Sequence, residues 1–253
     1  MIALSVNLNK IALIRNSRDT TNPSVPDHAQ MCIDAGADGI TVHPRPDQRH
    51  IRAQDCFDLA KALSVEFNIE GNPFSGPRKS ERQGVTDYPG FMQLVREIRP
   101  AQCTLVPDTD GQLTSDHGFD LTKDGDRVAP LVAELKSLGI RTSLFMDPDP
   151  QQIRLAAQTG TDRIELYTES YAAAFKSGQD LDTVFAGFMR AAEVAAEEGL
   201  QLNAGHDLDL HNLPRFATVP GLLEVSIGHA LTVDAIRMGL ANAVAAYQKA
   251  LGK

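Results

Sequence analysis

Three apolar stretches of the chain each end in a histidine, and this pattern is the first sign of chemistry. His43 closes "GITVH", His206 closes "LQLNAGH" and His229 closes "LEVSIGH". Two glutamates occupy comparable places, Glu70 near the end of "FNIEG" and Glu165 within "RIELYT". Histidine and glutamate with a tuned pKa are the usual groups that move protons near neutral pH. The residues therefore predict acid–base catalysis, provided that the fold brings these five positions together.

The elements that must position these residues follow from the alternation of two kinds of segment. Short β-rich runs alternate with longer segments of helical periodicity, and the runs are "IALSVN", "GITVH", "FNIEG", "CTLVP", "TSLFMD", "RIELYT", "LQLNAGH" and "LEVSIGH". Strands separated by helices imply right-handed crossovers and a parallel sheet. Eight strand-and-helix units within 253 residues match the size of a TIM (β/α)8 barrel. We expect residues 1–253 to form one such domain, and an open doubly wound α/β sheet is the alternative.

Local signals support these elements. A glycine closes each of four helical segments shortly before a strand: Gly36, Gly139, Gly160 and Gly199. Asp149 followed by Pro150 predicts a helix cap and a first-turn proline. A repeat of apolar residues every three or four positions predicts one C-terminal helix through Val233, Ile236, Leu240, Val244, Tyr247 and Leu251. The strand runs read as nearly continuous apolar residues, which indicates strands covered on both faces. Two long polar loops, 71–90 and 108–125, follow the third and fourth strands.

Further polar residues follow the same strand ends, where barrel enzymes carry their active sites. They are Asn7, Asn9, Lys10, Arg18, Arg45 and His50, and Gly228 precedes His229 at the end of the last run. The glycines of "AGHD" and "IGHAL" offer backbone N–H groups after the last two strands, where barrels commonly bind phosphate. The arginines Arg15, Arg18, Arg45 and Arg49 could hold a second anion. Two anion sites across one pocket would suit two phosphorylated substrates or one bisphosphate.

The composition limits the partners and the setting of the chain. A net charge of −9 argues against a nucleic-acid surface. The N-terminus does not read as a signal peptide, and no run approaches the roughly 20 apolar residues of a membrane span. Three cysteines without metal or redox spacing suggest a reducing, cytoplasmic setting. Two histidines and a carboxylate would suffice for a metal, although no H-x-H spacing supports one.

A set of motifs occurs in a fixed order along the chain: "VNLNKIALIRNSR", "DGITVHPRPDQRHI", "NIEG", "LVPD…LTSDHGFD", "SLFMD", "IELYT", "LNAGH" and "IGHAL". Together these motifs resemble the pyridoxine 5′-phosphate synthase family over nearly the whole chain. It implies a TIM-barrel enzyme of vitamin B6 biosynthesis without metal or organic cofactor, assembled as a homo-oligomer, typically an octamer. Its implied reaction joins 1-deoxy-D-xylulose 5-phosphate to 3-amino-2-oxopropyl phosphate and gives pyridoxine 5′-phosphate, inorganic phosphate and water.

The same resemblance implies roles for individual residues. His43 and Glu70 match proton acceptors, His206 matches the proton donor, and Glu165 matches a group that stabilises the transition state. The family's contacts to the amino-ketone phosphate correspond here to Asn7, Gly228 and His229. Its contacts to the deoxyxylulose phosphate correspond to Arg45, His50 and Thr114. Arg18 matches a further substrate-contacting arginine.

Two places depart from the family pattern. Asn9 and Lys10 stand where a well-known version has Asp-His, and lysine can hold an anion but is a poor neutral proton shuttle. Asp207 stands where the familiar residue is glycine; its carboxylate would repel a phosphate unless turned away, although its backbone N–H could still bind. From sequence we expect Asp207→Gly to be tolerated.

Two other functions fit parts of the pattern. An aldolase or isomerase on a phosphate-binding barrel is one, although the last four predicted strands contain no Schiff-base lysine and a metal-dependent form would need the histidines as ligands. A non-catalytic binding protein is the other, and it would not need Glu70 or Glu165 at the rim.

Overall fold

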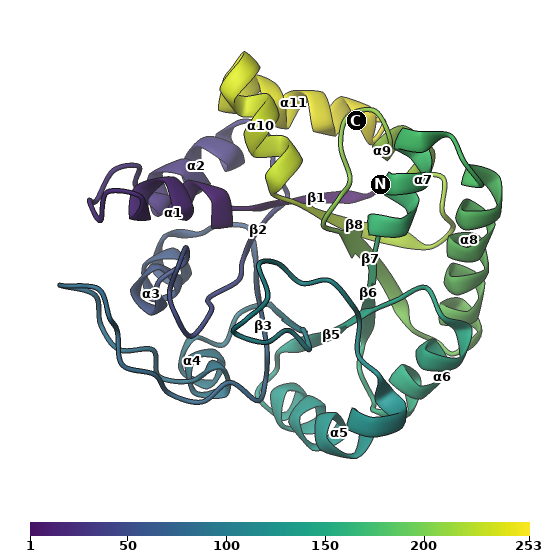
Figure 1. Ribbon diagram of the computed structural model, residues 1–253, viewed down its shortest axis with the longest axis horizontal. Helices are drawn as coiled ribbons and strands as arrows, with labels where there is room; N and C mark the ends of the chain where they lie inside the picture. The colour runs from purple at the N-terminus through teal and green to yellow at the C-terminus, as the bar shows by residue number, and fades with distance from the viewer.

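The computed structural model describes residues 1–253 and contains eight parallel strands that close into a barrel in the order β1 to β8 (Figure 1). The strands are β1 Ala3–Asn7, β2 Gly39–Val42, β3 Glu66–Gly71, β4 Gln102–Leu105, β5 Arg141–Met146, β6 Arg163–Tyr167, β7 Gln201–Gly205 and β8 Leu222–Ile227. The sheet closes because β1 pairs with β8, with Leu4 opposite Val225. This arrangement confirms the predicted TIM barrel and excludes the open doubly wound sheet.

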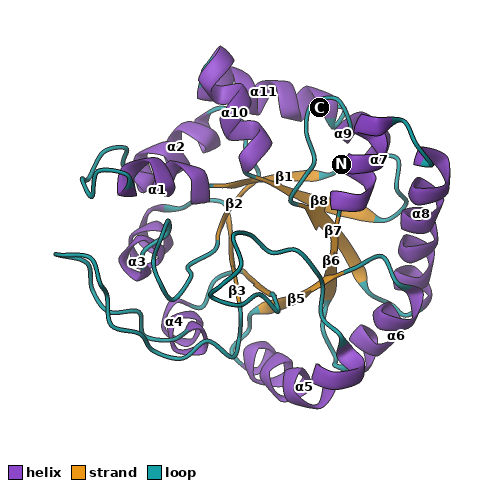
Figure 2. Ribbon diagram, in the orientation of Figure 1, coloured by secondary structure: helices purple, strands orange, loops and turns teal.

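Helices surround the barrel on its outer side (Figure 2). They are α1 Asn9–Asn16, α2 Val25–Asp34, α3 Ala53–Ala62, α4 Phe91–Ile98, α5 Leu121–Ser137, α6 Pro150–Gln158, α7 Glu169–Ser177, α8 Leu181–Glu197, α9 Leu213–Phe216, α10 His229–Met238 and α11 Leu240–Ala250. The two long loops were correctly predicted, but the second is shorter than expected because α5 already begins at Leu121. None of the helices combines the length and apolar character that crossing a membrane requires.

The two faces of the strands differ in chemistry. Outward side chains are apolar and fully buried under the helices, as with Leu4, Ile40 and Leu166. Inward side chains are largely polar and bond across the barrel: Arg163 of β6 reaches Glu224 of β8 at 3.0 Å, for example. The prediction that the strands are covered on both faces is confirmed, but the inner face is polar and not apolar. Barrel interiors are usually filled with bulky branched residues, and here hydrogen-bonded polar groups replace them.

The predicted helix ends are largely present. Gly36, Gly139, Gly160 and Gly199 all have positive φ, between 75° and 101°. The Asp149 side chain caps α6 by accepting a hydrogen bond from the N–H of Gln151 at 2.7 Å. The prediction of a single C-terminal helix was wrong. Gly239 adopts φ 86° and ψ 147°, which divides this segment into α10 and α11.

Candidate active site

Three of the predicted acid–base residues lie at the carboxyl ends of their strands, around the mouth of the barrel, and the fourth, Glu165, lies in the middle of its strand. His43 directly follows β2, Glu70 lies in β3, Glu165 lies in β6 and His206 directly follows β7. In a closed parallel barrel these ends all open on the same face. His43, Glu70 and Glu165 are buried, while the His206 side chain is 27% exposed.

His43 lies between two carboxylates. Its Nδ1 is 3.9 Å from Oε2 of Glu70, and its Nε2 is 3.2 Å from Oδ2 of Asp108. Asp108 also pairs with the guanidinium of Arg45. Burial alone would raise the pKa of Asp108, but His43 and then Arg45 outweigh it and hold that pKa below its usual value. Asp108 is thus an ionised partner of His43, and it was not among the residues singled out from sequence.

Three further carboxyl groups inside the barrel have raised pKa values. Burial is the main cause for Glu165, whose pKa rises to about 8 with a contribution from the charge of Glu224. Burial and then Glu66 raise the pKa of Glu224 to about 7, although Arg163 opposes the shift. Burial raises the pKa of Glu70 well above its usual value, and Glu165 and Glu224 add to this. A carboxyl group kept protonated near neutral pH can donate a proton or a hydrogen bond.

Two glycines permit the close packing around these carboxyl groups. A Cβ on Gly205 would lie 2.5 Å from the backbone oxygen of Ser226 and 3.1 Å from Oε1 of Glu165. A Cβ on Gly228 would meet the Asn7 side chain at 3.0 Å. The contact at Gly205 is closer than a Cβ comes to backbone, so that position has room for glycine alone, whereas a side chain at Gly228 would require Asn7 to move by a few tenths of an ångström.

His206 is held from both sides of its ring. Its Nδ1 lies 2.7 Å from Oδ2 of Asp207, and its Nε2 lies 2.7 Å from Oγ1 of Thr114. The Tyr167 ring packs edge-on against it at 5.4 Å. His206 has a positive φ of 78°, which is uncommon for a residue other than glycine. Because Thr114 contacts His206, the β4 loop, residues 106–120, reaches across the mouth to the end of β7.

Asn7 and Asn9 organise the start of α1 and the end of β2. The Asn7 side-chain oxygen accepts a hydrogen bond from the N–H of Asn9 at 3.0 Å, and its amide nitrogen lies 3.5 Å from Glu70. The Asn9 side-chain oxygen accepts a hydrogen bond from the N–H of His43 at 2.9 Å. Each asparagine thus contacts a predicted catalytic residue directly.

Arg45 and His50 complete the side of the mouth near β2. Arg45 donates to the backbone oxygens of Thr109 and Gln112, both at 3.2 Å, so the β4 loop occupies much of its hydrogen-bonding capacity. The N–H of Ile51 donates to Nδ1 of His50 at 2.9 Å, which leaves Nε2 of a neutral ring to carry the proton. Burial, followed by the positive charges of neighbouring residues, lowers the pKa of His50 well below its usual value.

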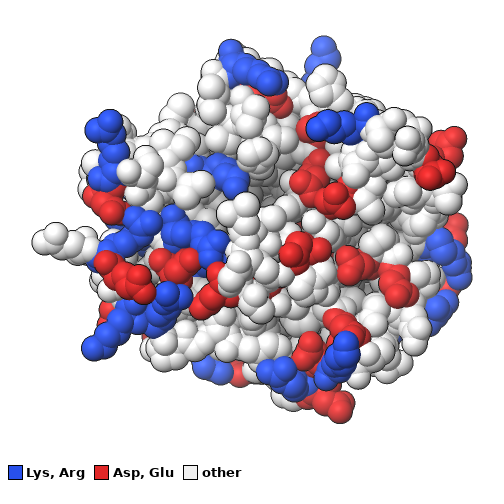
Figure 3. All heavy atoms as spheres, viewed as in Figure 1, with Lys and Arg blue, Asp and Glu red and all other residues white.

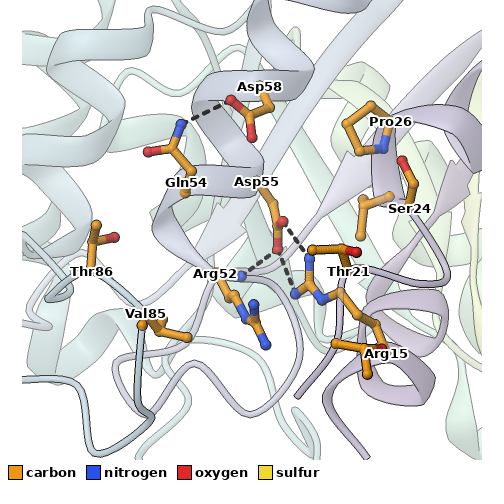
Figure 4. Close-up of a pocket in the computed structure, with 13 residues that line it drawn as sticks. Arg15, Thr21, Ser24, Pro26, Arg52, Gln54, Asp55, Asp58, Val85 and Thr86 are labelled. Carbon is orange, nitrogen blue, oxygen red and sulfur yellow. Dashed lines mark hydrogen bonds and ion pairs between the residues drawn. The ribbon is translucent and has the colours of Figure 1, made fainter. Parts of the chain in front are cut away.

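Other predicted residues are more exposed or have a different role. Arg18 and His229 are exposed, and Lys10 is partly exposed in the first turn of α1. Arg15 does not offer an anion site, because its guanidinium pairs with Asp55 at 2.5 Å beside a cavity of about 350 Å³ (Figure 4). In the space-filling view, basic and acidic side chains gather together over the α1 and α3 side of this face (Figure 3).

Asp108 could have been found from sequence, because it follows β4 in "TLVPD" at the same rim as the other candidates. Glu224 and Arg163 gave no comparable signal, since each lies inside a strand run. No group of three or more His, Cys, Asp or Glu side chains lies close enough together to hold a metal ion.

Comparison with solved structures supports the barrel fold alone. The tryptophan synthase α-subunit of Pyrococcus furiosus matches with a TM-score of 0.60 and 13% identity, over 100% of this chain and 98% of that one. N-(5′-phosphoribosyl)anthranilate isomerase from the same organism matches with a TM-score of 0.57 and 9% identity, over 100% of this chain and 99% of that one.

Comparison of sequences is more specific. The family model for "Pyridoxal phosphate biosynthesis protein PdxJ" matches residues 4–253. Pyridoxine 5′-phosphate synthase of Xanthomonas axonopodis pv. citri is 56% identical over 248 residues, which cover 96% of this chain and 94% of that protein. The synthase of Xylella fastidiosa is 51% identical over 96% of this chain and 92% of its own length. The chain therefore belongs to the pyridoxine 5′-phosphate synthase family of vitamin B6 biosynthesis enzymes.

Proposed function

We propose that this enzyme condenses 1-deoxy-D-xylulose 5-phosphate with 3-amino-2-oxopropyl phosphate to give pyridoxine 5′-phosphate, inorganic phosphate and water. The observation that carries the proposal is the set of acid–base groups around one mouth. His43 faces Glu70 at 3.9 Å, and Glu70 and Glu165 are buried carboxyl groups with raised pKa values. A reaction with several proton transfers needs such a set.

The chemistry assigns work to these groups. The amine of one substrate attacks a carbonyl of the other, and loss of water gives an imine. Removal of a proton beside that carbon gives an enamine, phosphate leaves, and ring closure with loss of a second water completes the pyridine. His43, and Glu70 in its ionised form, would accept protons in these steps, and His206 would donate one. Glu165, protonated below pH about 8, would donate a hydrogen bond to oxygen that becomes negative in the transition state.

The substrate phosphates would bind at two places on the mouth. Asn7, Gly228 and His229 would hold the amino-ketone phosphate, with the N-terminus of α10 directed at it. Arg45, His50 and Thr114 would hold the deoxyxylulose phosphate. A phosphate at Arg45 would compete with the backbone oxygens of the β4 loop for the same guanidinium.

Residues outside the cluster have proposed roles too. Arg18 and Lys10 would contact substrate, Asn9 would position the end of β2, and the N–H of Asp207 would contribute to an anion site. A closed mouth would also protect the imine and enamine from hydrolysis.

We also propose that the enzyme is a cytoplasmic homo-oligomer of one-domain subunits, in the family's case an octamer. Four exposed apolar side chains on α1 and α10 would suit such contacts: Leu13, Ile14, Ile236 and Met238. Light scattering on the purified chain measures the subunit number, and a monomer at working concentration would contradict this part.

The test of the reaction mixes metal-stripped protein with both substrates and follows pyridoxine 5′-phosphate and free phosphate together. Equal release of the two supports the proposal. Phosphate without the pyridine ring would indicate a partial reaction and direct attention to Lys10 and Asp207. Neither product from folded protein would contradict the proposed substrates.

A further inference from the structure

We propose that Asp108 is a positioning residue that fixes which ring nitrogen of His43 faces Glu70. The inference rests on the proposed role of His43 as a proton acceptor and adds a residue to that machinery. Asp108 does not need to touch substrate in this role, because it acts through the imidazole.

The surroundings of Asp108 make its carboxylate an acceptor for three donors. Nε2 of His43 lies 3.2 Å from Oδ2, Oγ of Ser115 lies 3.4 Å from the same oxygen, and the Arg45 guanidinium pairs with it. Asp108 is only 5% exposed. Buried carboxylates are stable when they are paired and hydrogen-bonded in this way, so the group stays ionised beside His43.

An ionised carboxylate at 3.2 Å from Nε2 selects one form of the neutral imidazole. Nε2 must carry the hydrogen that Asp108 accepts, and Nδ1 must then carry the lone pair. Nδ1 is the atom that faces Glu70 at 3.9 Å. The opposite tautomer would place a lone pair against the carboxylate and a hydrogen toward Glu70, which would remove the base from the reacting side.

The backbone at His43 restricts the ring further. The His43 N–H donates to Asn9, so the residue is anchored on its main chain as well as at Nε2. Two other charged or titratable groups lie near the ring: Arg45, which shares Oδ2 of Asp108 with it, and His50, with its ring centre 6.4 Å away. Neither accepts a hydrogen bond from Nε2 in place of Asp108, because Arg45 is a cation and His50 uses Nδ1 to accept from Ile51.

A purely structural role for Asp108 is the competing explanation. Its backbone oxygen accepts a hydrogen bond from the Asn72 amide at 2.6 Å, and its side chain contacts Ser115 in the β4 loop. Asp108 could therefore serve only to anchor that loop and Arg45. The two explanations differ at the imidazole of His43, which a loop anchor would not change.

The primary test is nitrogen NMR of the full-length protein labelled at histidine, without substrate, as the pH is raised until the His43 ring is neutral. The neutral wild-type ring is expected to carry its hydrogen on Nε2. Asp108→Asn keeps the shape but removes the charge, and it is expected to populate the other tautomer. A neutral wild-type ring protonated on Nδ1, or a ring unchanged by Asp108→Asn, would overturn the proposal.

Kinetics provide the second readout. Asp108→Asn is expected to lower kcat by at least about 10-fold and by up to about 10⁴-fold, the loss seen when the carboxylate that fixes the tautomer of a catalytic histidine is replaced by an amide elsewhere, with a smaller change in KM. Asp108→Glu is expected to restore part of kcat. Ser115→Ala, the matched control, removes a different contact to the same oxygen and should keep most of the rate. A change in KM alone, or equal losses in both variants, would favour the loop anchor.

Failure of the proposed substrates is distinguishable from failure of this inference. The NMR result needs no substrate, so it stands even when the wild type does not turn over the two phosphates. Conversely, an active wild type with the wrong His43 tautomer would refute the role of Asp108 and leave the reaction intact.

Discussion

Replacing Glu165 should separate the stability of this protein from its catalysis. Glu165 is 4% exposed, and its pKa lies at about 8 against the ordinary value of 4.5. Between these two values the folded protein retains a proton that the unfolded chain has lost, so stability falls as pH rises. A shift of about 3.5 units at 1.36 kcal/mol per unit corresponds to about 5 kcal/mol, lost from pH 4.5 upward and fully lost above pH 8.

Glu165→Gln removes this titration and keeps the shape of the side chain. The variant should therefore gain stability relative to wild type as pH rises, with little difference at pH 4.5 and a gain of up to about 5 kcal/mol above pH 8. Urea denaturation at pH values from 4.5 to 9 measures the difference. Glu81→Gln, at a side chain that is 85% exposed, is the matched control and should show no comparable trend. A constant difference between Glu165→Gln and wild type at every pH would refute the reasoning.

Activity should respond in the opposite direction. Glu165→Ala removes the donor and should lower kcat by roughly 10²-fold to 10³-fold, as loss of one such donor does elsewhere. Glu165→Gln keeps an N–H donor, although it cannot transfer a proton, and should lose less. Equal losses in the two variants would show that proton transfer, and not the hydrogen bond, is the role of Glu165.

Four other substitutions test separate parts of the site. His43→Ala and Glu70→Gln should keep the fold, as circular dichroism would show, and lose most turnover; a wild-type rate in either would remove that residue from the mechanism. The sequence alone predicted that Asp207→Gly is tolerated. Because the Asp207 carboxylate accepts a hydrogen bond from Nδ1 of His206, we now expect this substitution to lower kcat about tenfold. An unchanged rate would show that this contact is dispensable. Gly205→Ala should destabilise the fold by about 1–3 kcal/mol because its Cβ would meet a backbone oxygen at 2.5 Å, and an unchanged urea midpoint would refute that.

The fold could be predicted because its signals are local. Each β-rich run and each helix-ending glycine is visible within a few residues, and the barrel follows from their repetition. The break at Gly239 was missed for a physical reason: apolar side chains recur with helical spacing on both sides of it, from Val233 to Tyr247. Only the backbone angles of Gly239 reveal that the chain turns there.

The places of the candidate residues at the strand ends could be predicted from sequence, but the pairings between them could not. His43 and Glu70 were found because both follow strands, and parallel strands end at the same rim. The pairing of His43 with Asp108 joins residues 65 positions apart (43 and 108), and no local pattern contains that information. The contacts of Arg45 were likewise not visible in the sequence. The sequence indicated Arg45 as a phosphate ligand, whereas in the structure it donates to backbone oxygens of the β4 loop.

The polar interior of the barrel connects the fold with the chemistry of the candidate site. Its inward residues alternate with the large outward residues that dominate each run, and several are short, such as Ser5 and Thr41, so the strands read as apolar throughout. That interior places Glu224 where its charge raises the pKa values of Glu165 and Glu70. An apolar filling would bury the same two carboxyl groups without this charge, so the residues beneath the mouth contribute to the protonation states on which the proposed catalysis depends.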